Sequence, residues 1–396
     1  MRVLAPCSLL ALLVLVGCGL AGHDGPSAAS GPASPVVVPP VAGTGAFSPS
    51  PTSATPVVLG FPVDRISVAD VDGDGRGDVV AAYVSPFDAR LVWLRATVDG
   101  ALETSRTIVE LGGVGDFDLG DLDGDGFPDV AVMDSVAKEV RVLRNQRDGT
   151  FTPTSTVAFA DGGGSVRFGR FDDDGHLDFV VAGGNNIWRC VGDGVGGFTP
   201  MGSGPHPHPV HGVIAVGDFD GVGEHEVVTA TTFGALGSTG YWDLMTLHPG
   251  GTTQRSGVAS GSWPYSRPRL ARLEAGAVLG VVVQGGASGL ELWTGYVAGQ
   301  GHLTHVLRME PAAIADTAVA DLDLDGIDDL VVALTSADVV EVARGDGTGD
   351  VGAVAPVAVP SPTAVALGDV DGDGVKDLVV TDVTASVTVR LGVPKP

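Results

Sequence analysis

The sequence predicts an all-β fold, a seven-bladed β-propeller of four-stranded antiparallel blades. An acidic nine-residue pattern, Asp-x-Asp-x-Asp-Gly-x-x-Asp, recurs along the chain at intervals of about 49 residues. Short β-branched runs separated by Gly and Asp turns surround each copy, without the 3.6-residue periodicity of a helix. Four short strands in a repeat of this length are typical of a propeller blade. A β-solenoid, the alternative repeat fold, uses shorter periods.

The pattern occurs in four complete and three degenerate copies. The copies begin at Asp70, Asp121, Arg170, Asp218, Arg272, Asp321 and Asp369. Because neighbouring copies start 48 to 54 residues apart, we interpret residues 46–396 as one array of repeats and not as several independent domains.

The first unit illustrates the expected blade. An apolar strand at 66–69 enters the acidic loop, a β-branched run at 79–84 leaves it, and a third strand follows at 91–94. In the next unit a turn at 147–151 leads into a fourth strand at 152–157. Each blade is therefore expected to carry its acidic loop between its first and second strands.

The last unit supplies only three strands, at 363–367, 378–381 and 386–391. Its fourth strand is expected from the other end of the chain, at 47–58, where the three prolines are tolerable on an outermost strand. This strand would cover an edge that otherwise exposes unpaired backbone groups. The sequence thus predicts a ring closed by an N-terminal strand joining the C-terminal blade.

The acidic loops have the composition of calcium sites. Carboxylates at positions 1, 3, 5 and 9 and a backbone carbonyl at position 7 are expected to converge, and oxygen ligands at this density favour Ca²⁺ over Mg²⁺. The Gly at position 6 permits the tight turn. The predicted ligands of about four structural Ca²⁺ ions are Asp70, Asp72, Asp74, Arg76, Asp78, Asp121, Asp123, Asp125, Phe127, Asp129, Asp321, Asp323, Asp325, Ile327, Asp329, Asp369, Asp371, Asp373, Val375 and Asp377, with Arg76, Phe127, Ile327 and Val375 acting through their carbonyls.

An EF-hand and a metal-free turn both fit these loops less well. An EF-hand requires Glu at position 12 and a following helix, whereas position 12 here is Ala81, Val132, Val332 or Val380, each in an expected strand. Asp and Gly also make good turns without a metal. However, four carboxylates within nine residues repel one another unless a cation or protons intervene.

The degenerate copies have fewer potential ligands and predict weaker metal sites or none. In the third copy Arg170 replaces the first ligand, and we expect its guanidinium to pair with a remaining carboxylate in place of an ion. The fourth copy lacks the position-5 ligand, and the fifth, at Arg272, predicts no site. The weaker candidate ligands of the third and fourth copies are Asp172, Asp174, Asp178, Asp218, Asp220 and Glu226.

The complete loops, each followed by a Leu/Val/Ala run such as Leu378-Val379-Val380, resemble those of the FG-GAP/VCBS repeat family, which includes the integrin α-chain propeller. The resemblance covers residues 46–396 and is specific because the motif recurs in phase. It implies an integrin α-like propeller that binds calcium. Some relatives bind glycans, and some polysaccharide lyases and phospholipases carry related propellers.

The N-terminus resembles that of bacterial lipoproteins. Residues 1–17 form a short signal peptide with a charged start and an apolar run too short to span a bilayer, and Leu15-Val16-Gly17-Cys18 matches a lipobox. Acylated Cys18 would anchor the chain, and residues 18–45, rich in Pro, Ser, Ala and Gly, form a tether. Gly19, where an Asp would favour inner-membrane retention, favours the outer membrane of the cell envelope. We expect an exported protein whose lone Cys190 is a buried thiol.

The remaining candidate chemistry is sparse. His206, His208 and His211 could hold a transition metal but fit better as solvent-facing loop residues. Trp93, Trp188 and Trp293 lie on third strands and are expected to pack between blades, whereas Trp242, Trp263 and Tyr265 are better placed for a ligand surface. No nucleophile or acid–base cluster outside the metal loops points to an enzyme.

The net charge of −26 argues against nucleic acid and against a membrane contact other than the lipid anchor. The sequence therefore predicts a surface-anchored, non-catalytic binding or adhesion module for an extracellular protein or glycan. A lectin-like glycan-binding propeller is the alternative, and an extracellular polysaccharide lyase or phospholipase is a weaker one.

Overall fold

The computed structural model describes residues 38–52, 56–63, 65–83, 89–160, 162–184, 186–205, 210–218, 225–233, 239–247, 253–261, 268–275, 280–285, 289–294, 302–307, 314–352 and 356–396. Within these ranges the chain is built of β-strands, with one short 3-10 turn at Thr335–Ala337 and no α-helix. No helix in the described ranges has the length and apolarity to cross a membrane.

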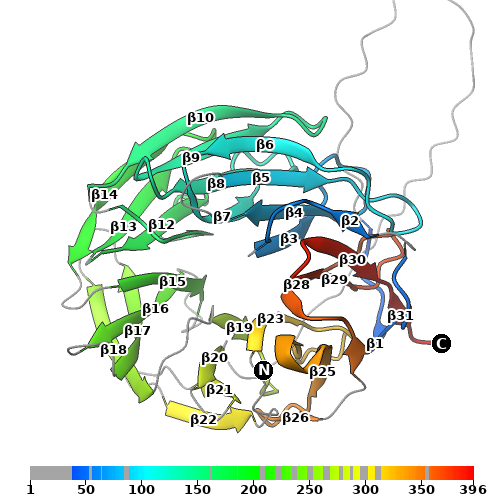
Figure 1. Cartoon of the computed structure of the whole chain (residues 1–396). Helices are drawn as coiled ribbons and strands as arrows, with labels where there is room; N and C mark the ends of the chain where they lie inside the picture. The colour runs from blue at the N-terminus through cyan, green and yellow to red at the C-terminus, as the bar shows by residue number, and fades with distance from the viewer. Residues whose placement is uncertain are drawn as a thin grey trace, which may run out of the picture. The chain divides into compact units, whose positions relative to one another are not determined.

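The all-β prediction is confirmed, and the strands form four-stranded antiparallel sheets in chain order (Figure 1). The first three sheets are β3 (Arg65–Ala69), β4 (Asp78–Tyr83), β5 (Ala89–Leu94) and β6 (Arg106–Leu111); β7 (Val114–Gly120), β8 (Asp129–Asp134), β9 (Glu139–Asn145) and β10 (Phe151–Ala158); and β11 (Ser165–Gly169), β12 (Asp178–Gly183), β13 (Asn186–Gly192) and β14 (Phe198–Pro205).

The next three sheets follow the same order. They are β15 (Val210–Gly217), β16 (Glu226–Phe233), β17 (Thr239–Leu247) and β18 (Thr253–Gly261); β19 (Arg269–Ala271), β20 (Gly280–Gly285), β21 (Gly289–Thr294) and β22 (His302–Leu307); and β23 (Ile314–Ala320), β24 (Asp329–Leu334), β25 (Val339–Gly345) and β26 (Val351–Gly352), where β27 (Val357–Ala358) also pairs with β25.

The last sheet combines both ends of the sequence. It contains β28 (Pro362–Gly368), β29 (Asp377–Asp382), β30 (Ser386–Arg390) and the N-terminal β2 (Val57–Val58). In Figure 1 the blue β2 lies beside the red β30, and the register pairs Val57 with Val387. The N–H of Thr52 donates to the carbonyl of Val389 across 3.1 Å. Among the described residues 47–52, the backbone bonds to this edge are single ones such as this, consistent with Pro49 and Pro51 having no N–H.

A second pairing of the chain ends starts earlier than the sequence predicts. β1 (Gly43–Phe47) pairs with β31 (Gly392–Pro394) as a separate two-stranded sheet. The N–H of Val41 donates to the carbonyl of Gly374 (2.7 Å), and that of Gly43 to the carbonyl of Leu322 (3.0 Å). The described strands therefore begin within the last residues of the expected tether, before residue 46.

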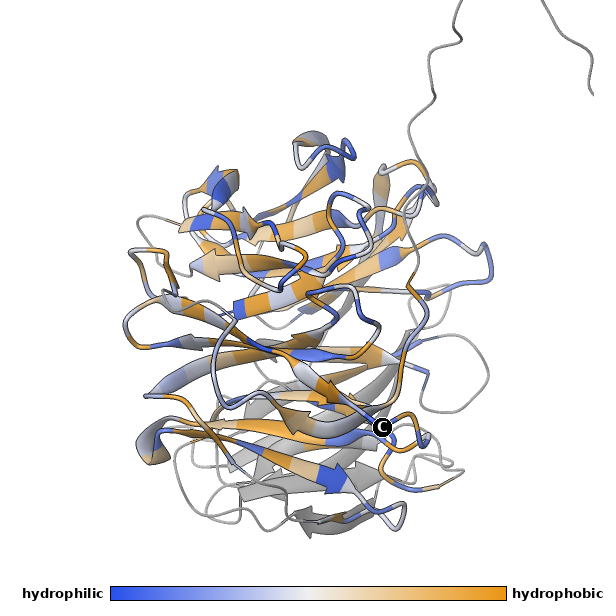
Figure 2. Cartoon of the chain, turned by 90° about the vertical axis from the view of Figure 1, so that its right-hand side faces the viewer, coloured by the Kyte–Doolittle hydropathy of each residue, from blue (hydrophilic) through white to orange (hydrophobic). Residues whose placement is uncertain are grey.

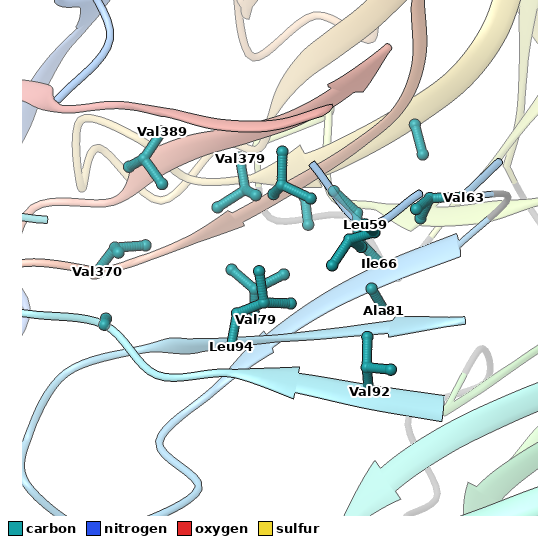
Figure 3. Packing of buried hydrophobic residues seen from close by; sticks show 14 residues of the cluster. Leu59, Val63, Ile66, Val79, Ala81, Val92, Leu94, Val370, Val379 and Val389 are labelled. Carbon is teal, nitrogen blue, oxygen red and sulfur yellow. The ribbon is translucent and has the colours of Figure 1, made fainter. Parts of the chain in front are cut away.

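The core lies between neighbouring sheets. All six residues of β8, β12 and β24 are buried, because both faces of these second strands are covered. In Figure 3 the side chains of Val79 and Leu94, from the first sheet, pack toward those of Val379 and Val389, from the last. Hydrophobic stretches run along the strands, whereas hydrophilic residues mark many loops and strand ends (Figure 2).

From the second sheet onward, the first strands of neighbouring sheets contact one another in sequence order. β7 contacts β11, β11 contacts β15, β15 contacts β19, and β19 contacts β23. β23 then contacts β28, which in turn contacts β3 of the first sheet. Since each acidic loop leaves the end of a first strand, this arrangement presents successive loops in the same position on successive sheets.

Candidate metal centres

The aspartate at loop position 9 ties the loop to its own sheet. Oδ2 of Asp78 accepts the N–H of Val71, at the start of the loop, and Oδ1 accepts the N–H of Ala96, just beyond β5, at 2.7 Å. The same pair of bonds recurs at Asp129, Asp329 and Asp377, and also at Asp178 of the degenerate third loop. Position 9 is therefore a structural clamp whether or not the loop is complete.

The aspartate at position 1 folds the loop around itself. Asp70 accepts the N–H groups of Gly73, Asp74 and Gly75 at 2.7, 3.0 and 2.8 Å. The glycine at position 6 has φ of 86° to 90° in the four complete loops, which is the left-handed region expected from the sequence. These bonds hold the carboxylate toward the inside of the turn.

Position 4 shows one departure from this pattern. It is glycine with positive φ at Gly73, Gly124 and Gly372, but in the Asp321 loop it is Leu324, with φ of 56°. A branched side chain at this φ is strained. The side chain is 44% exposed, so packing contributes little to holding it there.

Three carboxylates converge at each complete loop, with ligand atoms within 4.8 Å of one another. The converging groups are Asp70, Asp72 and Asp78; Asp121, Asp123 and Asp129; Asp321, Asp323 and Asp325; and Asp369, Asp371 and Asp377. In three loops the position-5 aspartate stands outside the group of three, and in the Asp321 loop it is Asp329 that lies outside. In all four loops Oδ1 of the position-5 aspartate accepts the N–H of position 7, as Asp74 does from Arg76.

Two buried carboxylate oxygens that accept no hydrogen bond indicate whether a cation would fit in these loops. Oδ1 of Asp72 and Oδ1 of Asp323 are buried and accept no hydrogen bond, and Asp323 as a whole is only 9% exposed. A buried carboxylate oxygen without a partner is costly, and a hard cation would satisfy it. Since the surrounding ligand atoms are all oxygens, these residues fit Ca²⁺.

Burial opposes the negative charge of the clamp aspartates. It raises the pKa of Asp78 and of Asp377 to about 7, and that of Asp129 and Asp329 to about 6. Backbone N–H donors lower these values in part, and neighbouring aspartates raise them further. Without a cation, these loops therefore favour proton binding near neutral pH.

Basic side chains at the ends of third strands or directly after them reach three of the complete loops, and sequence reasoning missed them. Arg95 donates to Asp72 and to Asp74, the latter at 2.9 Å. Arg144 pairs with Asp123, and Arg344 with Asp323 at 3.0 Å. Arg147 adds a bond to Asp125, and Lys395 lies 3.3 Å from Asp323. A basic residue recurring about 20 positions after these three loops was the available signal.

The third loop differs from its prediction in which arginine it uses. Arg189 of β13 pairs with Asp172 and lies 3.6 Å from Asp178, whereas Arg170 is exposed. The backbone of Arg170 bonds instead to His225, whose N–H donates to the Arg170 carbonyl at 2.8 Å. A guanidinium does pair with this loop, but it belongs to Arg189 on β13 and not to Arg170 in the loop itself.

The other degenerate loops bring together fewer ligands. Glu226 is 2% exposed and Asp218 is half-buried, while Asp220 lies outside the described residues. At the fifth loop the N–H of Arg272 donates to Asp328, and no group of three potential ligands occurs there among the described residues. Asp174 of the third loop belongs to no such group either.

Several other predicted residues have defined positions. Trp93 is 1% exposed and packs with Val130 and Val132 of the next sheet, so its packing role is confirmed. Trp188 packs partly buried beside Phe159. Cys190 is a buried thiol, and burial raises its pKa to about 12. The residues or side chains that lie outside the described part are Cys18, His206, His208, His211, Trp242, Trp263, Tyr265 and Trp293.

Solved structures share the fold at low identity. BBS1N, solved in complex with ARL6DN, matches at a TM-score of 0.54 and 14% identity, over 90% of this chain and 97% of that one. An Agrocybe aegerita lectin matches at 0.53 and 18%, over 74% and 80%. A Lactobacillus plantarum protein matches at 0.52 and 13%, over 76% and 86%. These similarities support a propeller-like architecture. Comparison with curated protein sequences gives no match.

The sequence match to a family follows the acidic loops. The FG-GAP-like repeat matches residues 70–132, 121–181 and 281–380, which together exceed half of the chain and include the four complete loops. The same loops carry the converging carboxylates, the position-9 clamp and the position-6 glycine turn. The chain therefore belongs to the family of FG-GAP-like repeat proteins.

Proposed function

We propose that this protein is a calcium-stabilised, seven-bladed propeller, closed by its two chain ends, that is lipid-anchored to the cell envelope and acts as a non-catalytic binding module. Its partner is an extracellular protein or glycan. The observation that carries the metal assignment is the recurrence of three converging carboxylates at each complete loop. The unpartnered buried oxygens of Asp72 and Asp323 support it.

Two observations support the closed ring. β2 pairs with β30, so the last sheet has four strands only when both chain ends contribute. A single hydrophobic cluster also joins residues of the first sheet, such as Val79, to residues of the last, such as Val379 (Figure 3). A ring held in this way provides a rigid platform whose loops are available for recognition.

The proposed lipid anchor and tether are inferred from the N-terminal sequence. Acylation of Cys18 would place two or more acyl chains in the membrane, which is enough for stable attachment. The Pro- and Ser-rich segment that follows would hold the propeller away from the lipid surface. Globomycin treatment, which blocks lipoprotein signal cleavage, should leave an unprocessed precursor, and Cys18→Ala should release the protein from the envelope fraction.

Glycan recognition is the second candidate. The Agrocybe aegerita lectin recognises non-reducing terminal N-acetylglucosamine, and it shares this fold over most of both chains. At 18% identity the likeness concerns the fold. An array of glycans and extracellular proteins, probed with the full mature chain, distinguishes the two kinds of partner.

The metal assignment is tested by calorimetry and by anomalous scattering. Calcium titrated into chelator-treated protein should give a stoichiometry near four, and crystals grown with Ca²⁺ should show ions at the Asp70, Asp121, Asp321 and Asp369 loops. The Arg272 loop should hold none, and the Arg189 guanidinium should exclude an ion from the third loop. Absence of calcium binding in both experiments would overturn the assignment.

A further inference from the structure

The four complete loops differ in whether a basic side chain pairs with their carboxylates. Arg95 and Arg144 reach the carboxylates of positions 3 and 5 in their loops, and Arg344 reaches the carboxylate of position 3 in its loop. Among the described residues, no ion pair is formed by Asp369, Asp371, Asp373 or Asp377. The Asp369 loop thus carries its four carboxylates without a basic partner.

The difference follows from one position at the end of the third strand or directly after it. The residue whose N–H bonds the position-9 aspartate is Ala96, Asn145, Gly345 or Gly392. The residue immediately before it is Arg95, Arg144 or Arg344 in the first three cases and Leu391 in the fourth. The four loops are therefore aligned by the same hydrogen bond, and a single substitution in the repeat removes the guanidinium.

The basic residues nearest to the Asp369 loop in sequence are Lys376, at position 8 of the loop itself, and Arg390, and within the described part of the chain neither forms an ion pair with the loop aspartates. Arg390 of β30 donates to the carbonyls of Pro49, at 2.6 Å, and Ala358, at 3.2 Å. Leu391 packs instead against the hydrophobic cluster between the last and first sheets. The Asp369 loop therefore has an apolar residue at the position where the other three complete loops have an arginine.

A guanidinium and a metal ion compete for the same carboxylates. When Arg95 bonds Asp72 and Asp74, an incoming Ca²⁺ must displace that interaction or accept a positive charge close to itself, and both weaken binding. In the absence of metal, the same guanidinium relieves repulsion among the aspartates. At the Asp369 loop no guanidinium competes with the ion or relieves the repulsion among the aspartates, so calcium binding is more favourable there.

We propose that Arg95, Arg144 and Arg344 are affinity-determining residues that weaken calcium binding at their loops, and that the Asp369 loop is consequently the tightest calcium site. This inference rests on the proposed metal function and adds the order in which the sites fill. The carbonyl of Gly374, in the same loop, accepts the N–H of Val41. The proposed tightest site therefore also contacts Val41, near the start of the described residues.

The test exchanges the residue at the equivalent position. Calcium affinities are measured by calorimetry on the full mature chain, and Asp371→Asn and Asp72→Asn assign the heats to the Asp369 and Asp70 loops. We expect Arg95→Leu to tighten the Asp70 site by on the order of tenfold, and Leu391→Arg to weaken the Asp369 site by a similar factor. Arg90→Leu, on β5 and beside Glu110, is the matched control and should change neither site.

The outcomes separate this inference from the function on which it rests. If the wild-type chain binds no calcium, the proposed metal function fails. If it binds calcium at all four loops with equal affinity, or if Arg95→Leu leaves the Asp70 site unchanged, only the inference fails. Melting curves in saturating calcium identify a variant that does not fold, and Arg344→Leu then repeats the measurement at the Asp321 loop.

Discussion

Oδ1 of Asp178 accepts the N–H of Gly192 at 3.0 Å, although the loop that ends at Asp178 has lost its first metal ligand. The other oxygen accepts the N–H of Phe171, and the residue is fully buried. The degenerate third loop therefore contains the structural part of the motif without the full set of ligands. Position 9 has a role that is independent of a metal.

This relationship predicts that Asp178→Ala destabilises the protein equally with and without calcium. The substitution leaves two buried N–H groups unpaired, which costs about 2–5 kcal/mol of unfolding free energy. Denaturant unfolding in calcium and in chelator should give the same loss. Asp371→Asn is the comparison, because it should remove stability only when calcium is present. A loss at Asp178 that depends on calcium would contradict a purely structural clamp.

Calcium should raise the melting temperature of the wild-type chain. An ion that binds only the folded state stabilises it by RT ln(1 + [L]/Kd), about 2.7 kcal/mol per site at one hundred times Kd. Differential scanning calorimetry in calcium and in excess chelator measures the difference. Magnesium at equal concentration is the control and should stabilise less, because it retains its water ligands. Identical melting curves under all three conditions would argue against structural calcium.

The pH dependence should change sign with calcium. Burial raises the pKa of Asp78 and Asp377 from the ordinary 3.8 to about 7 in the folded, metal-free protein. The folded state then binds more protons than the unfolded chain between about pH 4 and pH 7, so lowering the pH across this window raises the free energy of unfolding. In saturating calcium the aspartates stay ionised, and acid lowers stability by releasing the ions.

Denaturant titrations at pH 5.0 and 7.5, with calcium and with chelator, check this prediction. The chelated protein should be more stable at pH 5.0, and the calcium-loaded protein at pH 7.5. The same sign in both conditions would show that the clamp aspartates are not the groups that titrate.

Leu324→Gly should stabilise the protein. Leu324 has φ of 56° at a loop position where the other complete loops have glycine. Glycine relieves this strain, and little packing is lost because the side chain is exposed. We expect a gain of about 1 kcal/mol, with Gly124→Leu, at the equivalent position of another loop, losing a similar amount. A loss of stability in Leu324→Gly would show that the exposed side chain has contacts that outweigh its strain.

The chain ends should contribute measurably to stability. A chain that starts at Val41 keeps β1 and β2 and should melt like the full mature protein. A chain that starts at Leu59 lacks both strands and exposes the edge of β30, so we expect it to lose several kcal/mol and to aggregate more readily. Equal melting temperatures for the two chains would show that these pairings contribute nothing to the fold.

The acidic loops illustrate what was predictable from the sequence. Asp70 and Asp78 lie within nine residues, so their spacing, the turn glycine and the flanking strands are local properties. The period of the repeats likewise predicts the four-stranded sheets, because each sheet is built from one continuous segment. The last sheet is the exception, because its fourth strand comes from the other end of the chain. The sequence still predicted this strand, since the last unit has only three and the segment around Val57 was available to complete it.

The sequence by itself determined the β architecture, the four complete loops and the carboxylates they contain, because these depend on residues close together in the chain. Only the tertiary structure decided which loops pair with a basic side chain, and with which one. Arg95 lies about 20 residues after its loop, and Arg189 rather than Arg170 reaches Asp172. The pairing depends on strand register and on which way a side chain points across the sheet. Charge partners are fixed by distance in space, and that distance exists only once the strands have paired.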